Sequence, residues 1–195
     1  MNCKTTGILL AGGKNSRMGT NKAFLEIDGI RLIDRTIDIY RQLFTEIIIV
    51  TNDPLSYLEF TDASVVTDIY KSKGPLCGIY TGLSYARTPY AFVSPCDMPF
   101  LNKDFISYLI GQSGKHDIIV PELPEGYQPL HAIYSRNCLP NIKRLLLMDK
   151  LKITGFYRDM RVLTIGEEQI RPFNPDGRLF RNLNTPEDVE KANGL

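Results

Sequence analysis

Short apolar runs that alternate with helix-periodic segments limit most strongly what this chain can fold into. The strand-like runs lie at residues 8–11, 47–50, 64–67, 91–93, 118–120 and 133–134. Between them, apolar residues recur every three or four positions, at 33–44, 76–83, 105–110 and 139–146, which is the period of a helix with one buried face. Strands that alternate with helices favour a mostly parallel sheet covered on both faces. We therefore predict one α/β domain over residues 1–195, with loops at 121–129 and 170–178.

Length, net charge and cysteine content indicate which partners and which cellular compartment to expect. A chain of 195 residues buries enough surface to fold without a disulfide or a metal staple. Its net charge of +1 favours neither nucleic acid nor a membrane as partner. No two of the four cysteines form a C-x-x-C motif, so we expect free thiols in a reducing compartment. The apolar stretch at 7–11 is too short for a signal segment or a membrane span, and we expect a cytoplasmic protein.

The segment after the first apolar run has the composition of a phosphate-binding loop. Gly12 and Gly13 let the backbone approach a ligand closely, and Lys14, Arg17 and Lys22 add three cations. A triphosphate is held by this combination of backbone donors and side-chain charge. The spacing matches neither a Walker A motif nor the dinucleotide-binding G-x-G-x-x-G pattern. A basic turn without a ligand is the alternative.

Polar residues follow three further apolar runs. In an open α/β sheet, ligands gather outside the carboxyl ends of the strands, and Asn52, Asp68 and Asp97 stand at such ends. Asn or Asp in this place also caps turns, which is the alternative for Asn52 and Asp68. Asp97 lies between Pro95 and Pro99, which restrict its backbone. Because Mg²⁺ needs only one or two carboxylates beside substrate phosphates, Asp97 alone is a sufficient ligand.

Five motifs in one order resemble the molybdenum cofactor guanylyltransferase family. They extend from Gly7 to Asp188 and consist of Leu10-Ala11-Gly12-Gly13-x-x-Ser16-Arg17-Met18-Gly19-x-x-Lys22, Gly74-Pro75-Leu76-Cys77-Gly78, Pro95-Cys96-Asp97-Met98-Pro99, Pro129-Leu130-His131-Ala132 and Asn182-Leu183-Asn184-Thr185-Pro186-Glu187-Asp188. The resemblance implies a Rossmann-like, three-layer αβα nucleotidyltransferase fold. Residues 121–128 and 151–171 depart from the family pattern, so acceptor contacts are the least defined.

The resemblance also assigns residue roles. It implies GTP binding by Leu10, Ala11, Gly12, Gly13, Lys22, Asn52, Asp68, Gly74, Pro75, Leu76 and Asp97. It implies catalytic roles for Arg17, Lys22 and Asp97, with Asp97 as the ligand of Mg²⁺. His131, Asn182 and Asn184 fall on the acceptor side. For His131 we prefer a packed or substrate-contacting role to that of a general base, because an attacking phosphate monoester is already largely ionised.

The reaction implied by the resemblance joins GTP to Mo-molybdopterin and releases pyrophosphate. Transient contact with the molybdenum-insertion protein is implied as well. One alternative is a cytidylyltransferase of the same fold that acts on molybdopterin or on a sugar or polyol phosphate. Another is a catalytically inactive nucleotide-binding regulatory module. The side-chain chemistry does not choose between guanine and cytosine.

Overall fold

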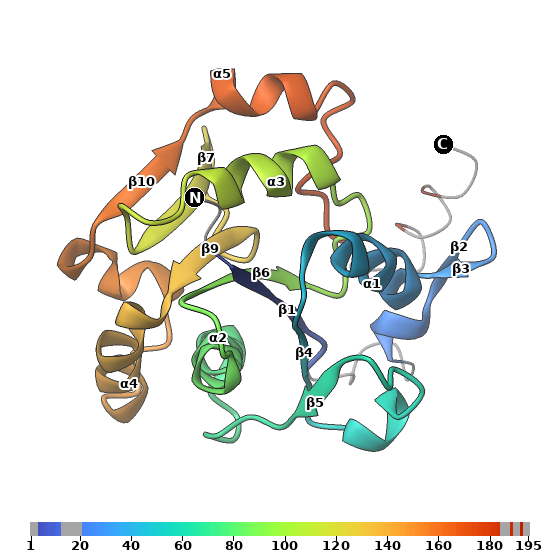
Figure 1. The fold of residues 1–195 in the computed structure, drawn as a ribbon, viewed down its shortest axis with the longest axis horizontal. Helices are drawn as coiled ribbons and strands as arrows, with labels where there is room; N and C mark the ends of the chain where they lie inside the picture. The colour runs from blue at the N-terminus through green and yellow to red at the C-terminus, as the bar shows by residue number, and fades with distance from the viewer. Residues whose placement is uncertain (1–3, 13–20, 184–187, 189–191, 193–195) are drawn as a thin grey trace.

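A central sheet between two layers of helices forms the fold in the computed structural model, which describes residues 4–12, 21–183, 188 and 192 (Figure 1). The strands of the sheet are β1 (Thr5–Leu10), β4 (Ile47–Val50), β5 (Ser64–Val66), β6 (Tyr90–Pro95), β7 (Ile118–Leu123), β8 (Gly126–Tyr127), β9 (Ala132–Ser135) and β10 (Val162–Ile165). The predicted α/β class and three-layer αβα architecture are confirmed.

The strands follow the order β10-β7-β9-β6-β1-β4-β5, and β8 pairs with β7. The pairs β6–β1, β1–β4 and β4–β5 are parallel, as is β7–β10. Strand β9 runs antiparallel to both of its neighbours, β6 and β7. The sheet is therefore mostly parallel, as predicted, and the carboxyl ends of its parallel strands meet at one edge.

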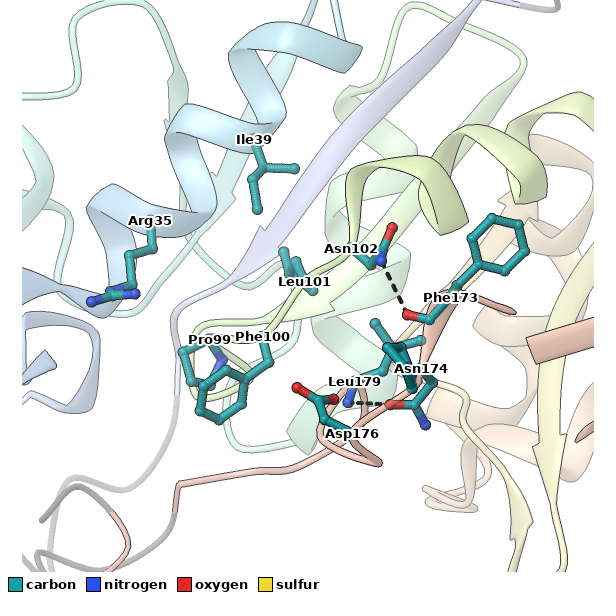
Figure 2. A pocket seen from close by; sticks show the side chains of 11 residues that line it. Arg35, Ile39, Pro99, Phe100, Leu101, Asn102, Phe173, Asn174, Asp176 and Leu179 are labelled. Carbon is teal, nitrogen blue, oxygen red and sulfur yellow. Dashed lines mark hydrogen bonds between the residues drawn. The ribbon is translucent and has the colours of Figure 1, made fainter. Parts of the chain in front are cut away.

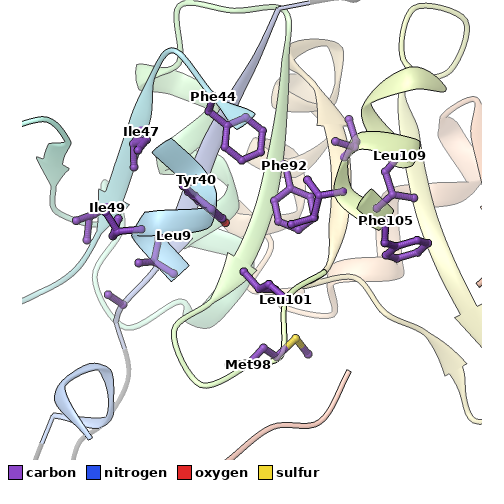
Figure 3. Close-up of a cluster of buried hydrophobic side chains, with 14 of the residues drawn as sticks. Leu9, Tyr40, Phe44, Ile47, Ile49, Phe92, Met98, Leu101, Phe105 and Leu109 are labelled. Carbon is purple, nitrogen blue, oxygen red and sulfur yellow. The ribbon is translucent and has the colours of Figure 1, made fainter. Parts of the chain in front are cut away.

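Helices α1 (Leu32–Leu43) and α3 (Lys103–Gly111) cover one face of the sheet, and α2 (Gly74–Tyr85) and α4 (Leu139–Leu147) cover the other. Because side chains alternate along a strand, Leu9 belongs to the core beneath α1 and α3, whereas Ile8 and Leu10 belong to the core beneath α2 and α4. Figure 3 shows the first of these cores, in which Leu9 lies near Tyr40 of α1. The two cores hold β1 from both sides.

Helix α2 lies close to β1 because glycines face the strand. A Cβ at Gly78 would lie 2.9 Å from Leu10, and a Cβ at Gly82 would lie 2.6 Å from Ile8. Those distances are too short for ordinary contacts, so a larger residue at either position would force the Ile8 or Leu10 side chain to shift. The last glycine of Gly74-Pro75-Leu76-Cys77-Gly78 thus has a structural role in the contact between helix and sheet.

Several short elements differ from the sequence prediction. The predicted loop at 121–129 was wrong in part, since β7 continues to Leu123 and turns back as β8. The carbonyl of Pro121 accepts from the N–H of Gln128 at 2.8 Å where the chain turns back. The second predicted loop contains the 3₁₀ helix η6 (Arg171–Phe173), which follows α5 (Glu167–Ile170).

Other short elements were missed because they carry little periodic signal. They are the hairpin of β2 (Glu26–Ile27) and β3 (Ile30–Arg31), strand β10, and the 3₁₀ helices η2 (Lys22–Phe24), η3 (Pro54–Tyr57), η4 (Arg136–Cys138) and η5 (Ile153–Asp159). Within the described part of the chain, no helix is both long and apolar enough to cross a membrane.

Candidate active site

The ends of four neighbouring parallel strands form the base of the candidate site. Backbone pairing continues one residue past three of these strands, β1, β4 and β6: Ala11 N–H donates to Val50 at 2.8 Å, Thr51 N–H to Val66 at 2.9 Å, and Cys96 N–H to Leu10 at 3.0 Å. The next residue in each case is one of those predicted to bind the nucleotide. The sheet therefore presents Gly12, Asn52 and Asp97 from one edge.

Asn52 and Asp68 lie together at this edge, as their places after neighbouring strands suggested. The Asn52 amide Nδ2 donates to Oδ2 of Asp68 at 3.0 Å. The other carboxylate oxygen of Asp68, Oδ1, is buried and has no hydrogen-bond partner among the described residues. A Cβ at Gly12 would lie 3.5 Å from Nδ2 of Asn52, so the Gly12 backbone lies beside this pair. The three positions lie together at the strand ends, and the buried Oδ1 of Asp68 has no hydrogen bond to a described residue.

Lys22 and Asp97 are brought together from distant parts of the chain. Lys22 begins η2, which the Asn21 side chain caps by accepting from Ala23 N–H at 3.1 Å. Nζ of Lys22 lies 3.6 Å from Oδ2 of Asp97, and their side chains are 30% and 21% exposed. The Asp97 backbone is held in turn, because its carbonyl accepts from Leu183 N–H at 2.9 Å. Two residues predicted to be catalytic thus form a half-buried ion pair.

Burial and charge act in opposite directions on Asp97. Burial raises the pKa of the carboxyl, and the neighbouring Lys22 ammonium lowers it, with the net pKa above the ordinary value. Burial, together with the Asp97 charge, also raises the pKa of the Cys96 thiol to about 12. In the part of the chain that the structure describes, no three His, Cys, Asp or Glu side chains gather into a metal cage. One carboxylate of this kind fits Mg²⁺, which takes its other ligands from phosphates and water.

The amino end of α2 divides the residues of its motif between surface and core. Gly74 and Pro75 are exposed, and Gly74 has a φ of 64°, a left-handed conformation that favours glycine. Leu76 is fully buried in the core between α2 and the sheet. Lys73, just before the helix, donates to Asp149 at 2.7 Å. Only the first two residues of the motif therefore present side chains or Cα hydrogens at the surface.

His131 lies in the protein interior. Its side chain is 0% exposed and packs against Phe92, Phe105 and Phe180, with ring centroids 5.1, 5.7 and 5.1 Å away. Burial lowers its pKa to about 3, and both ring nitrogens lack a hydrogen-bond partner among the residues described. The acceptor-side placement of His131 is therefore corrected: the side chain reaches no surface, and the packed alternative describes it.

The remaining predicted residues divide into two groups. Asn182 is exposed and directly precedes Leu183, whose N–H donates to the Asp97 carbonyl. It is therefore one residue away from a backbone contact with Asp97. Gly13, Arg17 and Asn184 lie outside the described residues. The backbones of Leu10 and Ala11 lie at the strand end, while their side chains are buried.

A cavity of about 500 Å³ that the sequence analysis missed lies between α1, the segment after Asp97 and residues 173–179 (Figure 2). Arg35, Phe100, Asn102, Phe173 and Asp176 are among its lining residues. Asn102 has a structural role there, because its Oδ1 caps α3 and its Nδ2 donates to the Phe173 carbonyl at 3.0 Å. No motif signalled this cavity, since its walls come from three distant segments. None of the predicted site residues lines it.

Comparison with known proteins places this geometry in a family. The sequence profile of the MobA-like NTP transferase domain matches residues 7–161. A protein of Desulfosudis oleivorans named molybdenum cofactor guanylyltransferase is 44% identical over 189 residues, which cover 96% of this chain and 93% of that protein. The fold matches the crystal structure of molybdopterin-guanine dinucleotide biosynthesis protein A from Archaeoglobus fulgidus, with a TM-score of 0.83, 24% identity and 96% coverage of each chain. It also matches Rv0371c of Mycobacterium tuberculosis in complex with manganese, with a TM-score of 0.69, 17% identity and 97% coverage of each chain.

Proposed function

This chain belongs to the MobA-like NTP transferase family, and from that membership we propose that it transfers GMP from GTP to Mo-molybdopterin. A terminal phosphate oxygen of the acceptor attacks the α-phosphorus of GTP, and the bond from that phosphorus to the bridging oxygen breaks. The products are molybdopterin guanine dinucleotide and pyrophosphate. The attacking phosphate monoester has a second pKa of about 6 and is largely ionised near neutral pH, so it needs no general base.

The observation that carries the proposal is the Lys22–Asp97 pair at the carboxyl end of β6. Asp97 would hold Mg²⁺, which supplies positive charge to the phosphate oxygens when it is bound. Lys22 would bind phosphate and stabilise the charge that develops on the departing pyrophosphate. Since phosphoryl-group chemistry depends mainly on positioning and charge neutralisation, two oppositely charged groups held 3.6 Å apart suit it.

The nucleoside end of GTP would lie over the neighbouring strand ends. The half-buried Asp68 carboxylate would accept a hydrogen bond from an N–H or O–H group of the nucleoside. Asn52 orients that carboxylate through its 3.0 Å hydrogen bond. The Gly12 backbone and the exposed Gly74 and Pro75 leave room for close approach of a base or sugar.

Several parts of the proposal rest on family membership alone. Gly13 and Arg17 would bind the phosphates, and Asn182 and Asn184 would line the acceptor side. We also propose that the enzyme works in the cytoplasm and passes its product to a molybdenum-insertion protein through transient contact. None of these roles requires His131, whose burial agrees with a reaction that lacks a general base.

Pyrophosphate release tests the proposal against both alternatives. Purified protein with Mg²⁺ and Mo-molybdopterin should release pyrophosphate from GTP with a higher kcat/KM than from CTP or ATP. Preference for CTP would make the protein a cytidylyltransferase of the same fold. Nucleotide binding without release from any nucleotide in the presence of acceptor would make it an inactive binding module.

A further inference from the structure

The hydroxyl of Tyr57 occupies a place that the family motifs do not explain. Tyr57 ends η3, and its side chain is 0% exposed. Nδ2 of Asn21 donates to its oxygen at 2.9 Å, and the hydroxyl donates to the Ala11 carbonyl at 3.3 Å. One oxygen therefore contacts two residues that are ten positions apart along the chain, one on each side of residues 12–20.

Both contacts lie directly beside residues of the candidate site. Ala11 precedes Gly12, whose backbone lies against Asn52. Asn21 precedes Lys22 and caps η2, the helix that Lys22 begins. The Tyr57 oxygen thus ties the end of β1 to the start of η2, the two points between which the glycine-rich phosphate motif runs.

The ring of Tyr57 is fixed by its own packing. Phe24 and Phe60 pack against it, with ring centroids 5.3 and 6.4 Å away. Burial raises the pKa of the hydroxyl to about 12, so it remains a proton donor at neutral pH. A rigid ring with a permanently protonated hydroxyl holds its two partners at one fixed separation.

We propose that Tyr57 is a positioning residue that links Ala11 to Asn21 and so sets the place of Lys22 relative to the Gly12 backbone. Two phosphate-binding groups that are held at a fixed separation before the ligand arrives lower the entropic cost of binding. The inference rests on the proposed function in one respect: the ligand of Gly12 and Lys22 is a nucleoside triphosphate.

The test compares two buried tyrosines that each lose a hydroxyl. Tyr57→Phe keeps the ring and removes the oxygen. Tyr40→Phe is the matched control, because the Tyr40 hydroxyl is also buried and contacts neither Ala11 nor Asn21. Its partners are Ile8 O at 3.1 Å and Ser94 Oγ at 2.8 Å. Each substitution should lower the melting temperature by about 2–4 °C. Only Tyr57→Phe should raise the Kd and KM for GTP, by about tenfold, with the KM for the acceptor unchanged.

A second variant tests the contact from its other side. Asn21→Ser keeps a side-chain oxygen that can cap η2 but removes the amide that reaches Tyr57. If one contact is responsible, Asn21→Ser should weaken GTP binding as Tyr57→Phe does, and the double variant should be no worse than the single ones. Unchanged GTP affinity in Tyr57→Phe, or equal losses in Tyr57→Phe and Tyr40→Phe, overturns the positioning role and leaves the transferase proposal intact. A wild-type protein that binds GTP with Mg²⁺ but releases no pyrophosphate overturns transfer alone, and one that binds no nucleoside triphosphate overturns both.

Discussion

The two halves of the sheet differ in how their polar side chains are hydrogen-bonded. In the half made of β6, β1, β4 and β5, polar groups stand beyond the strand ends with part of their bonding capacity unused, as Oδ1 of Asp68 shows. In the half made of β9, β7 and β10, Asp117 and the buried tyrosines bind partners within the protein, whereas the ring nitrogens of His131 have none among the described residues. Asp117, before β7, accepts from Arg161 at 2.9 and 3.0 Å and from Asn137 at 3.0 Å. The first half is arranged for a ligand and the second for stability.

The second half also pairs its buried tyrosines. The hydroxyls of Tyr134 and Tyr157 lie 2.7 Å apart, and Tyr134 also donates to the Pro129 carbonyl at 2.7 Å. Burial raises the pKa of both hydroxyls, so neither ionises near neutral pH. Substitutions in the first half should therefore change activity, and those in the second should change the free energy of unfolding. Four predictions test that division.

Asp97→Asn should have the largest effect. It keeps the size and one acceptor oxygen but removes the charge that would bind Mg²⁺, so kcat should fall about 100-fold or more. GTP binding without metal should change far less, because the Gly12 backbone and Lys22 remain. Steady-state pyrophosphate release at saturating Mg²⁺ measures the effect, and near-normal turnover there would remove Asp97 from the metal site.

Asp117→Asn should destabilise the fold by about 2 kcal/mol, because a buried carboxylate with several charged or polar donors loses its charge. Asp62→Asn is the matched control. Asp62 binds Arg41 with the same two-contact geometry, at 2.7 and 3.0 Å, but on the surface, so its loss should cost less than about 1 kcal/mol. Urea denaturation measures both variants. The kcat should stay unchanged in both variants. A fall in kcat for Asp117→Asn would contradict the prediction that substitutions in the second half change stability and not activity.

Lys22→Ala should weaken GTP binding about tenfold or more through the loss of a charged phosphate contact. Its thermal stability should stay nearly unchanged, since the side chain is partly exposed. Lys103→Ala serves as the control, because Lys103 begins α3 and donates to Gln42 of α1 instead of an acid at the candidate site. Titration calorimetry measures the affinity. A lower melting temperature with unchanged GTP affinity would make Lys22 a structural residue.

His131 should make the fold sensitive to acid. Its folded-state pKa of about 3 lies below the ordinary 6.5, so between these values the unfolded chain binds a proton that the folded chain excludes. Above pH 6.5 the imidazole is neutral in both states, and its burial does not lower the free energy of unfolding. As the pH falls below 6.5, the unfolded chain gains a proton and the free energy of unfolding decreases. Between pH 6.5 and 5.5 the loss should be about 1 kcal/mol. His131→Leu should remove that part of the slope in urea titrations, and identical slopes would show that the histidine titrates normally.

The sequence predicted one half of the site better than the other for a physical reason. In the half made of β6, β1, β4 and β5, Asn52, Asp68 and Asp97 each stand two residues past the end of an apolar strand, so the strand pattern placed them at one edge. The pairing of Lys22 with Asp97 depends on tertiary packing, and only the family resemblance linked them. Tyr57 belongs to no motif, because its proposed role depends on a hydroxyl that meets the Asn21 side chain and the Ala11 carbonyl only in the folded chain.

The sequence pattern was a poorer guide in the half made of β9, β7 and β10, because β9 is short and runs antiparallel to its neighbours. Strand β9 is only four residues long and antiparallel, so its direction could not be inferred from an alternation that favours parallel strands. His131 directly precedes it, and only the family resemblance placed this residue on the acceptor side. The surrounding aromatic cluster, which includes Phe105 and Phe180, is assembled from separate segments and has no local signature.

The position of β1 has a consequence for how the chain is made. Its pairing with β6 runs from Thr5 opposite Tyr90 to Leu10 opposite Pro95, so this edge of β1 has no native partner until residue 95 has been synthesised. At typical translation rates that interval is on the order of ten seconds. An unpaired strand as apolar as Ile8-Leu9-Leu10 is a template for intermolecular pairing. We therefore expect soluble yield to depend on chaperones and growth temperature, because the strand leading into the nucleotide loop is synthesised early and paired late.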